Sequence, residues 1–326
     1  MSSVSTGEFT LIDVFLSHFP RARVLVGPGD DCAVLAPSKE AQCITTDAVV
    51  EDVHFKRGWF TLEEIGHKAL AVNLSDLAAM GAVPRWFLCG LMLPTGFKRS
   101  EVTKLARGMS ALAREHGILL VGGNISQASE LSVTLTAAGE LPPGTVPLTR
   151  AGGRPEDVLY VSGSLGEARL GLQQLQTGWR TSQAIRRQKR PVPKVALGRL
   201  AARFASAGLD VSDGLAQDLQ HLCAASGVGA ELELERLPVS QAVLAAFGIQ
   251  GALAGGEDYE LLLAVPPART SAFERACARA GERVTRIGRL TSGKPGSIRD
   301  AAGRALRLPA GFDHFRGGTR IDRSRR

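Results

Sequence analysis

The first half of the chain alternates short apolar runs with longer stretches in which apolar residues recur every three or four positions. The short runs predict buried strands, and the longer stretches predict helices with one apolar side. Strands are expected at residues 43–46, 86–93, 118–121 and 131–139, and helices at residues 62–80 and 101–116. This half is therefore predicted to be one sheet with helices packed against it.

Residues 141–155 interrupt the alternation, because they are rich in Pro and Gly and hold few large apolar side chains. The pattern then resumes, with strands expected at 157–161, 209–211, 231–234 and 261–265 and helices at 167–176, 194–207, 215–225 and 272–280. Strands that alternate with helices in both halves predict a mixed α/β fold of two domains. The boundaries expected are 1–145 and 146–326.

The composition is that of a soluble globular protein. The 326 residues suffice for two apolar cores, and 44% hydrophobic with 22% charged residues excludes a disordered chain. No apolar run approaches the roughly 20 residues that span a bilayer, and no signal peptide is expected, so no membrane partner is predicted. Five cysteines without a C-x-x-C pair argue against a disulfide framework and a zinc site, and predict a cytoplasmic location.

The net charge of +7 and the pI near 9.5 at first suggest nucleic acid as a partner. Two segments carry this charge: residues 180–199 hold +7 and residues 316–326 hold +4, which leaves −4 for the rest. Pro191 and Pro193 predict that the first part of segment 180–199 is an exposed loop. Both segments either gather anionic substrates or are solvated surface, and nucleic acid is not an expected partner.

Acidic residues fall where predicted elements end. Asp30 and Asp31 follow the glycines of residues 27–29, and Asp47 ends a predicted strand after Thr45 and Thr46. Such oxygens are suitable ligands for Mg²⁺. Each group also has a simpler interpretation, since Gly, Pro and Asp form turns and Thr favours strands.

Asp76 stands near the end of an apolar helix, three residues after Asn73. A carboxylate there opposes the helix dipole and is costly when buried, unless a nearby Arg or Lys or a bound cation compensates it. Asp210, Ser212 and Asp213 lie between a predicted strand and a helix, where Ser212 or Asp213 is also a possible helix cap.

Convergence of several of these carboxylates would require cations. Two carboxylates about 4 Å apart repel by roughly 4 kcal/mol at an effective dielectric of 20. Mg²⁺ relieves that repulsion, and polyphosphate is its usual partner. The acids therefore predict a site for magnesium and phosphate.

Two Gly-rich turns, at residues 121–124 and 162–166, follow predicted strands, and the second leads into a helix whose amides can bind an anion. The common nucleotide motifs G-x-x-x-x-G-K-[ST] and G-x-G-x-x-G are absent from the sequence. An enzyme that uses a nucleotide with this sequence must have a less common fold.

Taken together, the motifs resemble the thiamine-monophosphate kinase family, which belongs to the superfamily of aminoimidazole ribonucleotide (AIR) synthetase and selenophosphate synthetase. The matching stretches follow the order of the family: 7–9, 27–35, 45–55, 73–84, 121–124, 148–150, 161–166, 210–219, 255–262 and 311–315. The set is specific, and it covers nearly the whole chain. AIR synthetase is the alternative enzyme, disfavoured by TTDAVVEDVHF (45–55) and GFDHF (311–315).

The resemblance implies an AIR synthetase-like fold and the transfer of the γ-phosphoryl group of ATP to thiamine phosphate, the last step of thiamine diphosphate biosynthesis. It also implies several Mg²⁺ ions and a homodimer formed through the N-terminal domain. The residues that match metal-binding positions are Asp30, Thr45, Thr46, Asp47, Asp76, Asp210 and Asp213. Those that match ATP contacts are Gly123, Arg150 and Ser212, and those near thiamine phosphate are His54, Glu257 and Phe312.

The chain departs from the family at one position, because Asn124 stands where the family usually has Asp. An amide oxygen still ligates a metal ion or contacts ATP, but it carries less charge than a carboxylate. One metal site is therefore expected to be weaker than in relatives.

The acceptor phosphate is largely dianionic at pH 7, so we expect direct in-line transfer and assign no general base.

Overall fold

The computed structural model describes residues 7–21, 24–29 and 31–306, and it divides into two compact units. Unit 1 comprises the chain up to Leu74 together with Pro84–Glu140. Unit 2 comprises Ser75–Val83 and the described residues from Leu141 onward. Each unit combines helices with a sheet, which confirms the predicted mixed α/β fold class. In the described residues, no helix has the length and apolar character needed to cross a membrane.

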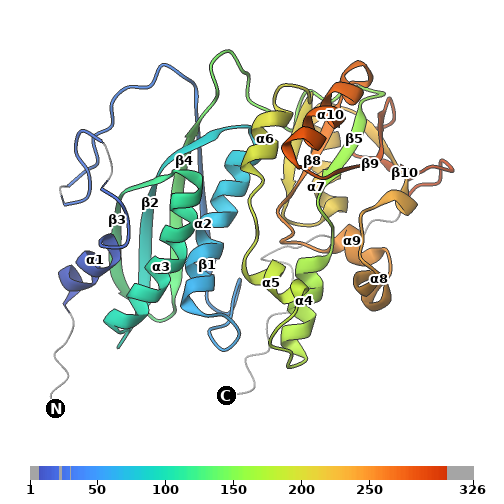
Figure 1. Cartoon of the computed structure of the whole chain (residues 1–326). Helices are drawn as coiled ribbons and strands as arrows, with labels where there is room; N and C mark the ends of the chain where they lie inside the picture. The colour runs from blue at the N-terminus through green and yellow to red at the C-terminus, as the bar shows by residue number, and fades with distance from the viewer. Residues whose placement is uncertain (1–6, 22–23, 30, 307–326) are drawn as a thin grey trace. The chain divides into compact units, whose positions relative to one another are not determined.

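Unit 1 is built on a four-stranded sheet in the order β1-β4-β2-β3. Strand β1 runs antiparallel to β4, and β2 runs parallel to β3. Helices α2 and α3 lie next to each other in front of this sheet, as Figure 1 shows. The elements are α1 (Glu8–Leu16), β1 (Gln42–Val50), α2 (Leu62–Ala79), β2 (Val83–Pro94), α3 (Arg99–His116), β3 (Leu119–Ala128) and β4 (Ser132–Glu140).

Glycines allow α2 and α3 to pack closely. A Cβ atom on Gly66 of α2 would collide with the carbonyl of Leu105, and one on Gly108 of α3 would collide with that of Glu63.

The two faces of the sheet differ in burial. On β2, Phe87 is fully buried, whereas the next residue, Leu88, is 37% exposed on the opposite face. We call the less buried side the open face of unit 1.

Two predictions in unit 1 are wrong. Asp47 does not end a strand, because β1 continues to Val50 and pairs with β4 along its whole length. Residues 121–124 are not a turn, because β3 continues through them to Ala128 beside β2. Gly123 permits this pairing, since a Cβ atom there would collide with the carbonyl of Cys89. The long ladders of hydrogen bonds explain both differences.

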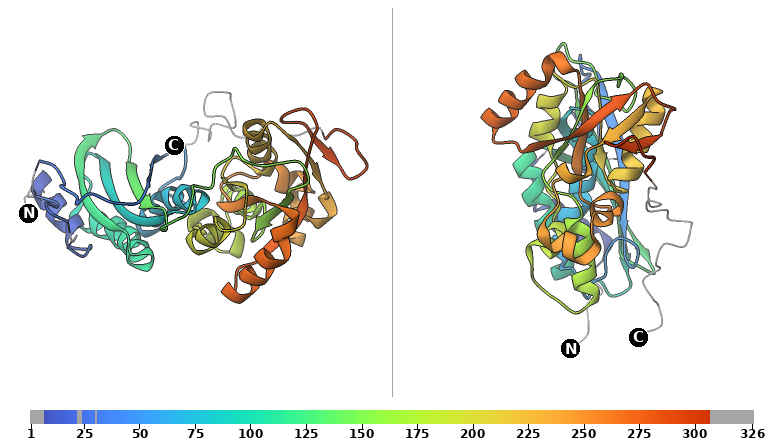
Figure 2. Two further views of the ribbon diagram at one scale, coloured as in Figure 1. Left: turned by 90° about the horizontal axis from the view of Figure 1, so that it is seen from above. Right: turned by 90° about the vertical axis from the view of Figure 1, so that its right-hand side faces the viewer.

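Unit 2 contains a six-stranded sheet in the order β10-β7-β9-β5-β8-β6. Its strands are β5 (Val158–Ser162), β6 (Ala207–Val211), β7 (Gly229–Leu232), β8 (Glu260–Val265), β9 (Val284–Thr291) and β10 (Ile298–Asp300). Its helices are α4 (Glu167–Gln176), α5 (Gln183–Lys189), α6 (Val195–Ala201), α7 (Leu215–Ser226), α8 (Gln241–Phe247), α9 (Gln250–Ala254) and α10 (Thr270–Ala280). Two further views of them are given in Figure 2.

Both faces of this sheet carry an apolar core, so its central strands are buried throughout. On one face, α7 packs against residues such as Leu159 and Leu209. On the other face, α6 and α10 pack against residues such as Tyr160 and Leu263. Strand β8 therefore consists of six consecutive buried residues.

The structure also corrects the prediction for the segment 180–207. Its first part is not an exposed loop, because residues 183–189 form helix α5, in which Ala184 and Ile185 are buried. The predicted helix over 194–207 is shorter, since α6 ends at Ala201 and residue 207 already begins β6.

Candidate functional site

Strand pairing gathers several predicted site residues at one edge of the sheet in unit 2. Strand β6 runs antiparallel to β8, and Val211 is paired with Glu260. The end of β6 and the start of β8 therefore lie side by side. This places Asp210, Ser212 and Asp213 beside the turn that holds Glu257.

A buried hydrogen bond joins this edge to the end of α2. The hydroxyl of Ser75 donates to Oδ2 of Asp210 over 2.7 Å, and both side chains are buried. Ser75 precedes Asp76, which also belongs to unit 2 and lies in the last turn of α2. Asp76 therefore directly follows the residue that contacts Asp210, although the two acids are far apart in the sequence.

Asp218 organises the turn after β6. Its Oδ2 accepts hydrogen bonds from the backbone N–H groups of Ser212, Asp213 and Gly214 at 3.1–3.2 Å. Neither Ser212 nor Asp213 caps α7, which follows Gly214 without a side-chain cap. Burial and the negative charges of Asp210 and Asp213 raise the pKa of Asp218 to about 7. The turn is therefore rich in negative charge and would be stabilised by a cation.

The turn before β8 has a strained backbone. Glu257 and Tyr259 adopt positive φ angles of 65° and 51°, which cost about 1 to 2 kcal/mol each for residues with a Cβ atom. Backbone N–H groups of both residues donate to the end of β6, to the carbonyls of Ser212 and Val211. The Glu257 carboxylate accepts a 2.6 Å hydrogen bond from the amide of Gln188 on α5. Strain of this kind is typical of functional sites.

The predicted anion site at the start of α4 is already filled by a side chain. Asp258 accepts hydrogen bonds from the N–H groups of Gly166 at 2.6 Å and Ala168 at 3.2 Å. Burial, followed by the charges of Glu260 and Glu167, raises the pKa of Asp258 to about 7. The Gly-rich turn 162–166 therefore binds an internal carboxylate, and we no longer assign it to a phosphate.

In unit 1, the predicted metal ligands lie on different faces and edges of the sheet. Neighbouring residues of a strand point to opposite faces, so Thr45 and Asp47 share one face and Thr46 lies on the other. The Thr46 hydroxyl donates to the carbonyl of Leu135 over 2.9 Å. Asn124 is on β3, at the opposite edge from β1. Three strand spacings separate these edges, about 14 Å.

The remaining predicted residues are dispersed. His54 follows β1, and its Nδ1 accepts a hydrogen bond from the N–H of Val50, which leaves a proton on Nε2. The Arg150 carbonyl accepts a bond from Ser226 at the far end of α7, about 18 Å along the helix from Ser212. Gly123 lies in the middle of β3. Asp30 and Phe312 lie outside the described residues.

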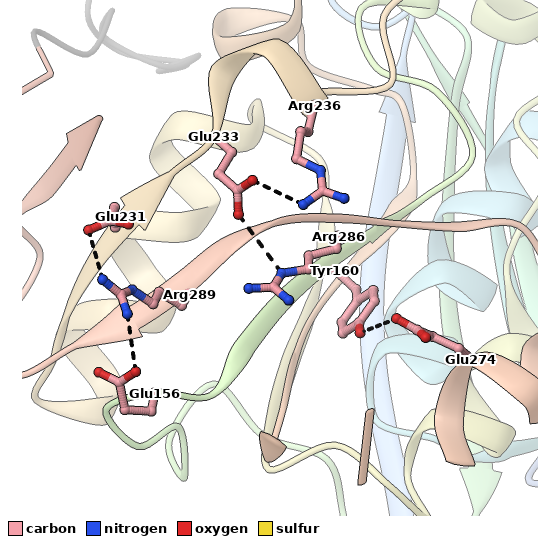
Figure 3. Close-up of polar contacts among 8 residues, drawn as sticks. All are labelled: Glu156, Tyr160, Glu231, Glu233, Arg236, Glu274, Arg286 and Arg289. Atoms are coloured by element: carbon pink, nitrogen blue, oxygen red, sulfur yellow. Dashed lines mark hydrogen bonds and ion pairs between the residues drawn. The ribbon is translucent and has the colours of Figure 1, made fainter. Parts of the chain in front are cut away.

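Across the described ranges, no three His, Cys, Asp or Glu side chains form a ready-made metal site. A pocket of about 590 Å³ in unit 2 is lined by Tyr160, Glu274 and Arg286, among others, and by none of the predicted site residues. Figure 3 shows partners of four of its polar side chains: Tyr160 donates to Glu274, and Arg236 and Arg286 both pair with Glu233. This pocket is separate from the candidate site.

Three residues of the site were not predicted from the sequence: Ser75, Asp218 and Gln188. Ser75 and Asp218 lie inside motifs that resemble the family, but nothing in their spacing showed which partner they meet. Gln188 lies in the basic segment 180–199, where the prolines indicated a loop. The helix has only two buried apolar residues, Ala184 and Ile185, which is too few for a helical pattern to be recognised in the sequence.

Two family profiles match the chain: "AIR synthase related protein, N-terminal domain" over residues 29–141 and the corresponding "C-terminal domain" over residues 154–301. Thiamine-monophosphate kinase of Salmonella typhimurium is 36% identical over 332 residues, which cover 96% of this chain and 99% of the relative. Two solved structures are also similar. Thiamine-monophosphate kinase from Stenotrophomonas maltophilia K279a has a TM-score of 0.81 and 36% identity, covering 91% of this chain and 96% of that one. AaThiL complexed with AMPPCP and TMP has a TM-score of 0.76 and 33% identity, and the match covers 97% of this chain and 99% of that one.

Proposed function

The chain belongs to the thiamine-monophosphate kinase family, and we propose that it transfers the γ-phosphoryl group of ATP to thiamine phosphate, giving thiamine diphosphate. Membership confirms the resemblance of the sequence motifs and makes the chain a kinase. The observation that carries the proposed reaction is similarity over 97% of the chain to a protein complexed with AMPPCP and TMP. The edge of β6 and β8 supports it, because acids and a strained turn converge there.

The donor set in unit 2 fits Mg²⁺. Asp210 and Asp213 both lie close enough to Asp218 for their negative charges to raise its pKa. Magnesium usually binds one or two carboxylates and completes its shell with water and substrate phosphates, so a three-carboxylate cluster is not required. We propose Asp210 and Asp213 as ligands, together with Asp76. Bound Mg²⁺ would neutralise the phosphate oxygens during transfer.

The remaining roles follow the family resemblance. We propose Asp30, Thr45, Thr46, Asp47 and, with its neutral amide, Asn124 as further metal ligands. Contacts to ATP are assigned to Gly123, Asn124, Arg150 and Ser212, and contacts to thiamine phosphate to His54, Glu257 and Phe312. His54 has a defined orientation for this role, since the hydrogen bond to Nδ1 directs its Nε2–H donor away from Val50.

The chemistry of the acceptor requires little from protein side chains. A phosphate monoester has its second pKa near 6 and is mostly dianionic at pH 7, so no general base is assigned. The barrier lies in bringing two polyanions together, and we propose that the enzyme lowers it by positioning and charge compensation in an in-line transfer.

We also propose that the enzyme is a cytoplasmic homodimer. Thr46 and Asn124 lie about 14 Å apart at opposite edges of one sheet, too far for one ion to reach both. Pairing of two copies through the open face would bring β1 of one copy toward β3 of the other. Leu88 and Ile44, which are 37% and 62% exposed, provide apolar surface for such an interface.

The test is an assay of ADP release with ATP, Mg²⁺ and one candidate acceptor at a time. We expect turnover with thiamine phosphate, none with thiamine, and none with the aminoimidazole precursor used by AIR synthetase. Omission of Mg²⁺ should abolish turnover. ADP release with the AIR precursor alone would reject the proposal in favour of that relative.

A further inference from the structure

Helix α5, within the basic segment 180–199, is anchored firmly in unit 2. The hydroxyl of Ser182 caps its first turn by accepting from the N–H of Ile185 over 2.9 Å. It packs closely on α4, where a Cβ atom on Gly171 would collide with the backbone of Ala184. Gln188 is only 3% exposed. The basic side chains of this segment therefore start from a fixed backbone.

This helix contacts the turn that holds the proposed substrate residue. The buried Gln188 amide donates to the Glu257 carboxylate over 2.6 Å. Two residues of the basic segment reach another acid of the same stretch, Glu260. The Lys194 ammonium lies 3.2 Å from one Glu260 oxygen, and the Arg187 guanidinium lies 3.9 Å from the other.

The position of Glu260 itself is closely defined. The carboxylate is 2% exposed and accepts a hydrogen bond from the Ser162 hydroxyl. Gly163 is required beside it, because a Cβ atom there would collide with this carboxylate. One cation is enough to neutralise a buried carboxylate. Arg187, Lys194 and Glu260 together carry a net charge of +1.

The two cations also keep hydrogen-bond donors available. An ammonium has three donors and a guanidinium has five. In the part of the chain that the structure describes, the Arg187 guanidinium makes no hydrogen bond, and 35% of its side chain is exposed. Lys194 is 15% exposed. Glu260 contacts both cations and leaves donors for an anion, much as a Lys–Glu ion pair in other kinases presents its lysine to phosphate.

We propose that Arg187 and Lys194 bind the phosphate dianion of thiamine phosphate and that Glu260 is their positioning residue. The inference rests on the proposed function and identifies a subsite within it. The substrate carries opposite charges at its two ends, a cationic thiazolium and an anionic phosphate. The segment offers both charges: Gln188, which directly follows Arg187, holds the Glu257 carboxylate, and Glu260 holds the Arg187 and Lys194 cations. Charge-assisted hydrogen bonds of this kind are the strong ones.

The experiment compares Lys194→Gln and Arg187→Gln with Arg186→Gln, which removes the same charge from an exposed position of α5. KM is measured separately for thiamine phosphate and for ATP. Loss of one charge-assisted hydrogen bond should raise the KM for thiamine phosphate about ten- to hundredfold. The KM for ATP should change less than twofold, Lys194→Arg should restore most of the affinity, and Arg186→Gln should match the wild type.

Melting temperatures separate binding from a structural role. If both Gln variants melt lower but keep the wild-type KM for thiamine phosphate, the cations only neutralise Glu260 and the proposal is wrong. A rise in the KM for ATP alone would assign the cluster to the nucleotide and also overturn it. The controls keep the two proposals apart: a wild-type enzyme inactive on thiamine phosphate contradicts the proposed function, whereas an active wild type with unaffected Gln variants contradicts only this subsite.

Discussion

At the scale of single residues, the acids of the turn before β8 have three different roles although they are almost adjacent. Glu257 faces Gln188 in the proposed substrate site, Asp258 caps α4, and Glu260 holds two cations. Burial, followed by the charges of Glu260 and Glu167, raises the pKa of Asp258 to about 7. An acid with such a pKa makes a specific contribution to the pH dependence of stability.

Replacement of Asp258 by Asn should change that dependence. The usual pKa of Asp is near 3.9, so between about pH 4 and pH 7 the folded chain binds more protons than the unfolded chain. The contribution of Asp258 to the free energy of unfolding therefore falls as the pH rises through this window. Asn cannot ionise, and its amide oxygen still accepts from Gly166, although its NH2 group cannot accept from Ala168. From pH 5 to pH 8, we therefore expect the free energy of unfolding of Asp258→Asn to rise by about 1 to 3 kcal/mol relative to that of the wild type.

Thermal unfolding at several pH values would measure this gain. Asp258→Ala is the control, because it loses the cap at every pH and should lie below the Asn variant by about 1 kcal/mol. Parallel stability profiles for wild type and Asp258→Asn would show that Asp258 does not titrate in this range.

Asn124→Asp should strengthen the binding of Mg²⁺. The variant restores the carboxylate usual in the family, and a carboxylate attracts a divalent cation more strongly than an amide does. We expect half-saturation of the initial rate at a several-fold lower Mg²⁺ concentration. A titration at saturating ATP and thiamine phosphate would measure it, and an unchanged midpoint would mean that Asn124 does not contact the metal.

At the scale of elements, the sequence predicted regular segments well and irregular contacts poorly. The helix over 62–80 and the strands over 86–93 and 261–265 agree with α2, β2 and β8 to within a few residues, because apolar periodicity is a local property. The end of β1 was wrong because its extension depends on pairing with β4, which lies about 90 residues away.

The candidate site shows the same limit. Its acids were recognisable in the sequence, since Gly and Asp at strand ends are local features. Their partners were not: Ser75 meets Asp210 across 135 residues, and Asp258 meets Gly166 across 92. Helix α5 was missed because two prolines follow it and because its buried face exists only against α4.

The packing of α4 on α5 can be tested at Gly171. Alanine favours a helix by about 1 kcal/mol over glycine, so Gly171→Ala would stabilise an isolated α4. In the protein its methyl group would collide with the backbone of Ala184, and we expect a net loss of about 1 to 3 kcal/mol. Chemical denaturation would measure it, with the exposed Gln173→Ala as control. A more stable Gly171→Ala variant would contradict the close contact.

At the scale of the whole molecule, activity should depend on pairing of two copies through the open face of unit 1. Leu88→Lys places a charge on that face, and burying an unpaired lysine costs several kcal/mol. We expect a dimer of two 34.5 kDa chains to become a monomer and to lose most of its turnover. Leu244→Lys on α8 is the matched control, because Leu88 and Leu244 are both 37% exposed. Sedimentation together with the ADP assay would test this. A monomeric wild type, or a dimeric and fully active Leu88→Lys variant, would exclude this interface. Loss of both dimerisation and turnover in Leu88→Lys, but not in Leu244→Lys, would establish that the enzyme needs the interface.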